Sequence, residues 1–159
     1  MLKSFILICV FLGGYSNAIS QSTDEIHWIT FPELEVALTE NPKPVFIFFH
    51  AKWCAYCKKI ERKVFTKTDV IKTLNDAYYA LKMDVETQDS IVFDNVVFTN
   101  TQSLTQRNGI HEIPLSLGSR AGFPFSLPAT VLLNKDFTVK NRVFEYYTSS
   151  ELLELLKLP

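Results

Sequence analysis

The sequence predicts an α/β fold in which helices flank a central mixed β-sheet. Residues 44–50 form an apolar run without a formal charge, which is typical of a central strand buried on both faces. Two cysteines follow, and after them apolar residues recur at three- and four-residue steps with basic residues between them. This period indicates an amphipathic helix. Segments of both kinds alternate along most of the chain, as expected for a sheet covered by helices.

Ahead of the cysteines, the sequence predicts a strand, a helix and then the central strand. The first strand is expected over residues 26–29. Thr30 and Glu33 have the spacing of a helix capping box. Pro32 falls in the first turn, where proline is tolerated because those N–H groups have no helical partner. The helix should end near residues 41–42.

The cysteines lie in the middle of a predicted β-α-β-α-β unit. The helix that carries them is expected from Cys54 to about Phe65. A further helix should be capped by Thr68 or Asp69, and residues 78–83 are expected to form a third strand. Because parallel strands need crossover connections, this order predicts a parallel half of the sheet.

Residues 86–126 interrupt the regular order and are predicted to be an insertion. A hairpin is expected over residues 91–98, because Asp94 and Asn95 tolerate positive φ and separate two short apolar runs. Residues 110–117 are expected to form a short helix. Inserted loops often carry specificity, so this segment is a candidate for that role.

After the insertion, the sequence predicts a strand, its antiparallel partner and a last helix. The strand is expected over residues 127–133 and its partner over 139–147, with a turn at 134–136. Thr148 and Glu151 repeat the capping-box spacing before a leucine-rich stretch. Together with the parallel half, these elements complete a mixed sheet.

Residues 1–20 have the features of a secretory signal peptide. Lys3 precedes an apolar core, and the small residues Ser16 and Ala18 stand at the −3 and −1 positions of a cleavage site. An uncleaved membrane anchor is the alternative, but the apolar segment is shorter than the ~20 residues that span a bilayer. We therefore expect one exported domain, residues 21–159, that does not insert into the membrane after cleavage.

Cleavage would leave a single pair of cysteines. The sequence has three cysteines, and removal of Cys9 leaves Cys54 and Cys57 in a compartment where disulfides persist. Loss of Lys3 would leave 15 of the 16 basic residues against 17 acidic ones, a net charge of −2. This balance does not favour nucleic acid or anionic lipid as a partner.

Cys54 and Cys57 are the candidate catalytic residues. Cys54 is expected at a helix amino terminus, where unpaired N–H groups and the helix dipole stabilise a thiolate. Cys57 lies one turn later, so the two sulfur atoms can close a disulfide ring and open it again. The spacing predicts thiol-disulfide exchange, with Cys54 the exposed and more acidic cysteine.

At these residues the sequence resembles the thioredoxin superfamily, and in particular its exported bacterial Cys-x-x-Cys members. The resemblance rests on an apolar strand followed by Trp53, the cysteine pair and Lys58 at the start of a helix. It extends more weakly over residues 26–157. It implies a thioredoxin fold with the hairpin and loop insertion placed before a cis-proline strand. Leu127-Pro128 matches that cis-proline, which lies against the disulfide; an ordinary turn is the alternative.

The resemblance also implies how a substrate would bind. The backbone of Leu127, beside Pro128, would pair with an extended substrate chain as an added strand. Trp53 and Tyr56 would supply apolar contact, and Phe123 or Phe125 would add to it.

Two positions depart from thioredoxins proper. Phe48 and Ala80 stand where those proteins have a buried aspartate and its lysine partner. Deprotonation of Cys57 would therefore use water or a carboxylate such as Asp84 or Glu86. The Ala55-Tyr56 dipeptide between the cysteines matches neither reducing nor strongly oxidising relatives, so the direction of electron flow stays open.

Other interpretations of the cysteine pair stay open as well. Zinc would need two further ligands, and the histidines at positions 27, 50 and 111 are scattered. An inert disulfide is another alternative. The basic residues around the pair are expected to form a solvated helix face with at most a secondary effect on the thiolate; they are Lys52, Lys58, Lys59, Arg62, Lys63 and Lys67.

We therefore predict an exported thiol-disulfide oxidoreductase that exchanges disulfides with protein substrates through Cys54 and Cys57, as a reductase or isomerase. It is expected to be a monomer without cofactor or metal, and a membrane electron donor would recharge a reductase. The location would be periplasmic in a Gram-negative host and secreted otherwise. The alternative is a non-catalytic binding or chaperone module with an incidental disulfide.

Overall fold

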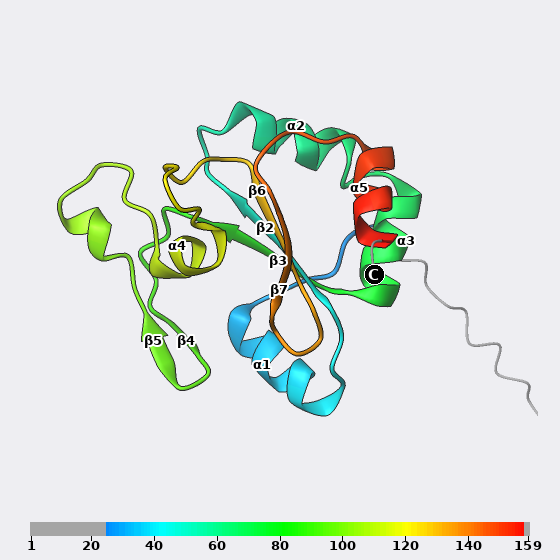
Figure 1. Cartoon of the computed structure of the whole chain (residues 1–159), viewed down its shortest axis with the longest axis horizontal. Coiled ribbons are helices and arrows are strands. Elements are labelled where there is room, and N and C mark those ends of the chain that lie inside the picture. The colour runs from blue at the N-terminus through cyan, green and yellow to red at the C-terminus, as the bar shows by residue number, and fades with distance from the viewer. Residues whose placement is uncertain (1–24, 158–159) are drawn as a thin grey trace, which may run out of the picture.

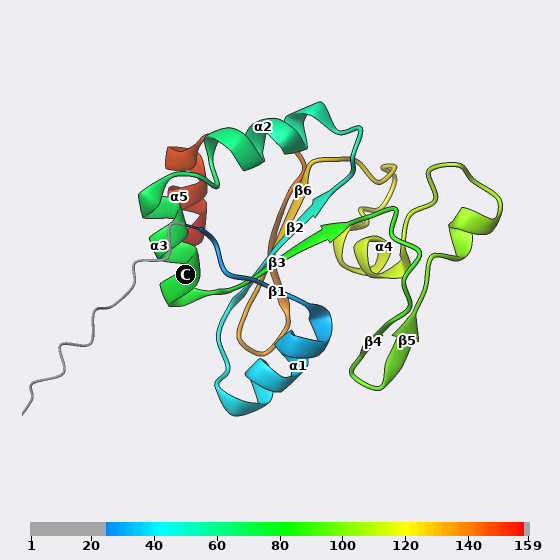
Figure 2. The same cartoon turned by 180° about the vertical axis from the view of Figure 1, so that it is seen from behind.

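A five-stranded mixed β-sheet forms the centre of the molecule, with helices on both faces (Figure 1 and Figure 2). The computed structural model describes residues 25–157, so the signal peptide predicted at residues 1–20 lies outside the described residues. The neighbouring strands β1, β3 and β2 are parallel, whereas β6 and β7 are antiparallel to their neighbours. In sheet order the strands are β1 (Trp28–Ile29), β3 (Tyr79–Asp84), β2 (Val45–His50), β6 (Ala129–Leu133) and β7 (Val139–Val143). The predicted mixed sheet is confirmed.

The helices form a layer on each face of the sheet. One face carries α2 (Ala55–Lys63), α3 (Thr68–Ala77) and α5 (Ser149–Lys157), and the other carries α1 (Phe31–Glu40) and α4 (Glu112–Gly118). No helix within residues 25–157 is long and apolar enough to cross a membrane.

The central strand β2 is buried as its apolar sequence predicted. All side chains from Val45 to Phe49 are 0% exposed. On the α2 face, the ring centre of Phe65 lies 4.9 Å from that of Phe48 and 5.3 Å from that of Trp28, in edge-on arrangements that aromatic rings prefer. This cluster fixes the carboxyl-terminal end of α2 against the sheet.

Both predicted capping boxes are confirmed. At α1, the Glu33 carboxylate accepts from the Thr30 N–H at 2.7 Å, and the Thr30 hydroxyl accepts from the Glu33 N–H at 3.4 Å. Thr148 and Glu151 repeat this exchange ahead of α5, at 2.7 and 3.4 Å. Each box satisfies N–H groups that a helix start leaves without partners.

Helix α3 starts one residue earlier than predicted. Lys67 is the N-cap and makes no side-chain capping bond, so the predicted cap by Thr68 or Asp69 is wrong. The physical reason is a tight turn before the helix, in which the Lys67 N–H donates to the Val64 carbonyl at 3.1 Å. Asp69 instead accepts from the Val70 N–H at 2.9 Å.

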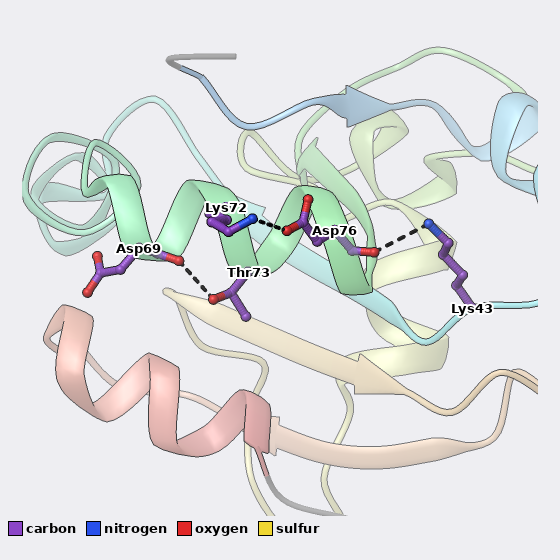
Figure 3. A network of polar contacts seen from close by, with 5 residues as sticks. All are labelled: Lys43, Asp69, Lys72, Thr73 and Asp76. Carbon is purple, nitrogen blue, oxygen red and sulfur yellow. Dashed lines mark hydrogen bonds and ion pairs between the residues drawn. The ribbon is translucent and has the colours of Figure 1, made fainter. Parts of the chain in front are cut away.

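Polar contacts stabilise α3 along its exposed side and at its end (Figure 3). Lys72 and Asp76 form an ion pair at 2.6 Å, and the Thr73 hydroxyl donates to the Asp69 carbonyl at 2.8 Å. Lys43, in the loop before β2, donates to the Asp76 carbonyl at 3.4 Å. A cation at a helix carboxyl terminus is favourable, and this one also links α3 to the loop before β2.

The insertion contains the predicted hairpin and short helix. Strands β4 (Ile91–Phe93) and β5 (Val96–Phe98) pair around Asp94 and Asn95, whose φ values are +51° and +58°. A short 3-10 turn, Thr101–Leu104, follows the hairpin. The buried His111 caps α4, because its Nδ1 accepts from the Ile113 N–H at 3.2 Å while its Nε2 faces the Asp89 carbonyl, also at 3.2 Å.

Two strands are shorter than predicted. β1 lacks residues 26–27, because the His27 N–H donates to the Asn75 side chain at 2.8 Å instead of to the sheet. β7 ends at Val143 rather than at residue 147. Val143 pairs with Thr130, and two residues before Thr130 stands Pro128, which has no N–H to donate to a longer ladder.

Candidate active site

Cys54 and Cys57 form a disulfide at the start of α2. The S–S distance is 2.09 Å and the Cα–Cα distance is 5.3 Å. Cys54 is the N-cap residue, and its sulfur accepts from the Cys57 N–H at 3.1 Å. When the bond is reduced, the same N–H and the helix dipole would stabilise a thiolate at Cys54.

Both cysteines are buried in the disulfide form. Cys54 is 4% exposed and Cys57 1% exposed, so the expectation that Cys54 would be exposed is wrong for this form. The reason is the disulfide itself, because it holds the Cys54 sulfur against Cys57 and against the first turn of α2.

The side chains beside the two cysteines point to solvent. Trp53 and Tyr56 are each 60% exposed. The Trp53 indole N–H donates to Glu86 at 2.7 Å, and the Asn108 amide donates to the same oxygen at 2.6 Å. Glu86, at the start of the insertion, therefore orients Trp53 through a charge-assisted bond.

The fold brings Leu127 and Pro128 next to Tyr56. The Leu127–Pro128 peptide bond is cis, the geometry that the sequence predicted. A groove of about 430 Å³ runs past these residues. It is lined by Tyr56, Leu127, Pro128, Phe144, Glu145 and Tyr146.

A second, smaller hollow also borders Leu127. Its volume is about 150 Å³, and Leu127 lines it as well as the groove. Trp53, Glu86, Asn108 and Phe125 contribute to its wall. Of the two phenylalanines expected near a substrate, Phe125 therefore lines this hollow, whereas Phe123 lines neither it nor the groove.

The sheet register corrects one pair of positions. Ala80 pairs with Phe46, and the residue beside Phe48 is Lys82. The Lys82 ammonium lies 3.3 Å from the carboxylate of Glu61, which stands one turn after Cys57 on α2. A half-exposed carboxylate–ammonium pair therefore links α2 to β3, although Phe48 itself is apolar.

Sequence reasoning missed this pair because its members lie on different elements. The i,i+4 spacing of Cys57 and Glu61 was a usable signal, since such residues are neighbours on a helix surface. Tyr146 and Glu145 were missed for a different reason. They lie in the loop before α5, where the sequence predicted a strand.

His50 adds a titratable group at the end of β2. Its ring stacks on Phe48 with ring centres 6.1 Å apart. Burial lowers the pKa of His50; the charge of Glu61 opposes this shift and that of Lys82 adds to it. The neutral imidazole is therefore favoured at this position.

The described residues hold no group of three or more His, Cys, Asp and Glu side chains placed to bind a metal ion. His111 caps α4 and His50 stacks on Phe48.

Comparison with known proteins gives a family and a set of similar folds. Residues 28–115 match the model of the thioredoxin-like family. Among curated proteins, none matches the sequence. A DsbH oxidoreductase has a TM-score of 0.57 at 16% identity, over 84% of this chain and 83% of that chain.

Two further structures support the same fold. A putative disulphide-isomerase from Bacteroides thetaiotaomicron has a TM-score of 0.56 at 24% identity, over 84% of this chain and 92% of its own. A thioredoxin from Thermus thermophilus has a TM-score of 0.54 at 20% identity, over 84% and 85%. Since the family model spans more than half of the chain and the strand order, helix layers and cysteine pair agree with it, this chain belongs to the thioredoxin-like family.

Proposed function

We propose that the protein is an exported thiol-disulfide oxidoreductase that acts on protein substrates. The observation that carries the proposal is the Cys54–Cys57 disulfide at the first turn of α2, next to a groove lined by Leu127 and Pro128. The signal peptide predicted at residues 1–20 supports export, with residues 21–159 as the mature domain. In a Gram-negative host the protein would be periplasmic.

The exchange begins with the reduced protein. The Cys54 thiolate attacks a substrate disulfide, a bond forms between Cys54 and one substrate sulfur, and the other leaves as a thiolate that takes up a proton. Cys57 then loses its proton and attacks the Cys54 sulfur. The second substrate sulfur leaves, the Cys54–Cys57 disulfide forms, and two electrons have passed to the substrate. A dithiol donor would reduce the pair again, and the reverse sequence would oxidise a substrate.

Glu61 is the proposed acceptor of the Cys57 proton. It stands one turn beyond Cys57 and is held by Lys82 at 3.3 Å. The carboxylates suggested by the sequence are engaged elsewhere. Glu86 accepts from Trp53 and Asn108, and Asp84 accepts from the Glu86 N–H at 3.0 Å.

Substrate would bind across Leu127. An extended chain that pairs with its backbone would place successive side chains on opposite sides. The groove beside Tyr56 and the hollow beside Trp53, both of which border Leu127, would receive these side chains.

Insulin reduction tests catalysis. The wild-type protein with dithiothreitol should precipitate the insulin B chain faster than a Cys54→Ser variant. In a secreting host, Cys57→Ser should accumulate mixed disulfides with client proteins, because the second attack is lost, whereas Cys54→Ser should not. Equal insulin rates for wild type and Cys54→Ser would instead indicate a non-catalytic binding module.

A further inference from the structure

We propose that the exposed basic side of α2 docks an acidic surface of the protein substrate, so that the protein prefers disulfides flanked by aspartate and glutamate. This inference rests on the proposed function and names its substrate class. The basic surface consists of Lys52, Lys58, Lys59, Arg62 and Lys63, all of which are exposed.

The basic surface is not neutralised within the described chain. The three ion pairs among residues 25–157 involve Lys72, Lys82 and Lys157 and none of the five residues of the basic surface. The one acidic residue on α2 is Glu61, and it pairs with Lys82 on the sheet side of the helix. The five positive charges therefore face solvent without a partner of opposite sign.

Folding accounts for only part of this arrangement, because the helix dipole favours the cations Arg62 and Lys63 in the last turn of α2 but not the remaining basic residues. Lys58 and Arg62, and likewise Lys59 and Lys63, are like-charge pairs at i,i+4, which destabilise a helix. Lys58 also stands in the first turn, where the helix dipole disfavours a cation. The other long exposed helices differ: α3 has the Lys72–Asp76 pair and α5 the Lys157–Glu154 pair.

Activation of the Cys54 thiolate accounts for only part of the surface. Arg62 and Lys63 are eight and nine residues after Cys54, which places them about 12–14 Å further along the helix axis. The Debye length is about 8–10 Å at physiological salt, so charges at that distance are largely screened from the sulfur. All five residues can instead interact with the negative charges of a partner that approaches α2.

The basic surface is continuous with the substrate groove. The Lys59 ammonium lies 4.2 Å from the ring centre of Tyr146, and Tyr146 lines the groove with Leu127 and Pro128. A substrate bound in the groove therefore extends over α2. This continuity favours a protein rather than an anionic membrane, because lipid headgroups on the same surface would cover the entrance to the disulfide.

Two synthetic peptide disulfides test the proposal. They share one sequence, except that the residues beside the cystine are aspartate and glutamate in one and asparagine and glutamine in the other. The pre-reduced protein is mixed with each, and the rate of reduction is followed by rapid quench and mass spectrometry. We expect the acidic peptide to react about 10-fold faster at low salt, the lower range of electrostatic steering. The ratio should approach one at about 1 M salt, where the Debye length is about 3 Å.

Charge-reversal variants locate the effect. Arg62→Glu with Lys63→Glu should bring the acidic-to-neutral rate ratio to one or below. Lys135→Glu with Lys157→Glu makes the same change in charge at exposed sites outside α2 and should keep the wild-type ratio. Since both rates come from one preparation, the ratio does not depend on the fraction of folded protein. A wild-type ratio near one at low salt, or an unchanged ratio in the α2 variant, overturns the proposal.

A binding measurement separates this proposal from the proposed function. The acidic peptide with serine in place of cysteine is titrated with the oxidised protein at low salt, and fluorescence anisotropy reports binding. If neither peptide is reduced, the proposed function fails, but this binding still decides whether the basic surface docks acidic chains. Binding to phosphatidylglycerol vesicles through Arg62 and Lys63, without binding of the peptide, would assign the surface to a membrane and overturn the proposal.

Discussion

Glu61 stands one turn after Cys57 on α2, and this spacing leads to a kinetic prediction. Replacing Glu61 with glutamine should slow the attack of Cys57 on a mixed disulfide by on the order of 100-fold near neutral pH, the lower end of what general acid–base catalysis contributes. The difference should shrink as the pH rises, since hydroxide then removes the proton directly. Rapid quench of a pre-formed mixed disulfide measures the step.

Glu35→Gln is the matched control for that experiment. Glu35 is half-buried on α1, as Glu61 is on α2, but lies on the opposite face of the sheet, and the same change there should leave the rate unaltered. If Cys57 attacks the mixed disulfide at the same rate in Glu61→Gln and in wild type across the pH range, water or another carboxylate accepts the Cys57 proton instead of Glu61.

His50 leads to a prediction about stability and pH. Its pKa is lowered from 6.5, chiefly by burial, so the folded protein holds the His50 proton more weakly than the unfolded chain does. The contribution of His50 to stability is therefore present above pH 6.5 and is lost as the pH falls through the lowered pKa. The urea midpoint should fall between about pH 7.5 and about pH 5.5, and this fall should be smaller in His50→Gln.

The comparison for His50 uses differences between the two pH values. At the higher pH, the difference in urea midpoint between His50→Gln and wild type reports the cost of altered packing against Phe48. This cost cancels when the midpoints of one protein at the two pH values are subtracted. If both proteins lose the same amount of stability, the pH dependence originates elsewhere.

At the scale of elements, the two capping boxes are the interactions whose contribution to the free energy of unfolding is most directly measurable. Thr30→Ala and Thr148→Ala each remove a hydroxyl that accepts from a helix N–H. Each change should lower the free energy of unfolding by about 1 kcal/mol, as the loss of an N-cap side chain usually does. Urea unfolding at neutral pH measures both losses.

Thr39→Ala provides the control within α1. The Thr39 hydroxyl donates to the Glu35 carbonyl at 3.0 Å, inside the helix, and caps nothing. Because alanine has the higher helix propensity, this change should be neutral or slightly stabilising. A loss at Thr39 as large as at Thr30 would show that the boxes contribute no special capping energy.

At the scale of the whole molecule, the redox potential combines contributions from several elements. The amino terminus of α2 stabilises the Cys54 thiolate and therefore the reduced form of the protein. A more stable reduced form makes the cysteine pair more oxidising. Ala55 and Tyr56 add no positive charge between the cysteines, and Phe48 places no carboxylate beneath them. We expect a potential on the order of −250 to −180 mV, between about −270 mV for thioredoxin and about −120 mV for the strongest oxidants of this fold.

Equilibration with glutathione, followed by the fluorescence of the neighbouring Trp53, measures this potential. A value at either limit would show that the residues between and beneath the cysteines do not set it. Phe48→Asp is the informative variant, because a carboxylate at that position should shift the potential towards that of thioredoxin.

The sequence by itself determined the features that depend on neighbouring residues. Both capping boxes, the hairpin around Asp94 and Asn95, the buried β2 strand and the position of Cys54 at a helix start follow from short-range backbone and periodicity rules. The family and the fold class followed from the same local motifs in their order along the chain.

The tertiary structure decided what depends on contacts between distant segments. Strand register paired Lys82 rather than Ala80 with Phe48, and packing placed Glu61 beside Lys82. The His27 N–H donates to the Asn75 side chain, which leaves β1 short, and β7 ends at Val143, opposite Thr130 and close to Pro128 in the sequence of the partner strand. Register and long-range packing are set by the free energy of the whole core, which no local window of sequence contains, and for that reason the groove beside Tyr56 became visible only in the folded chain.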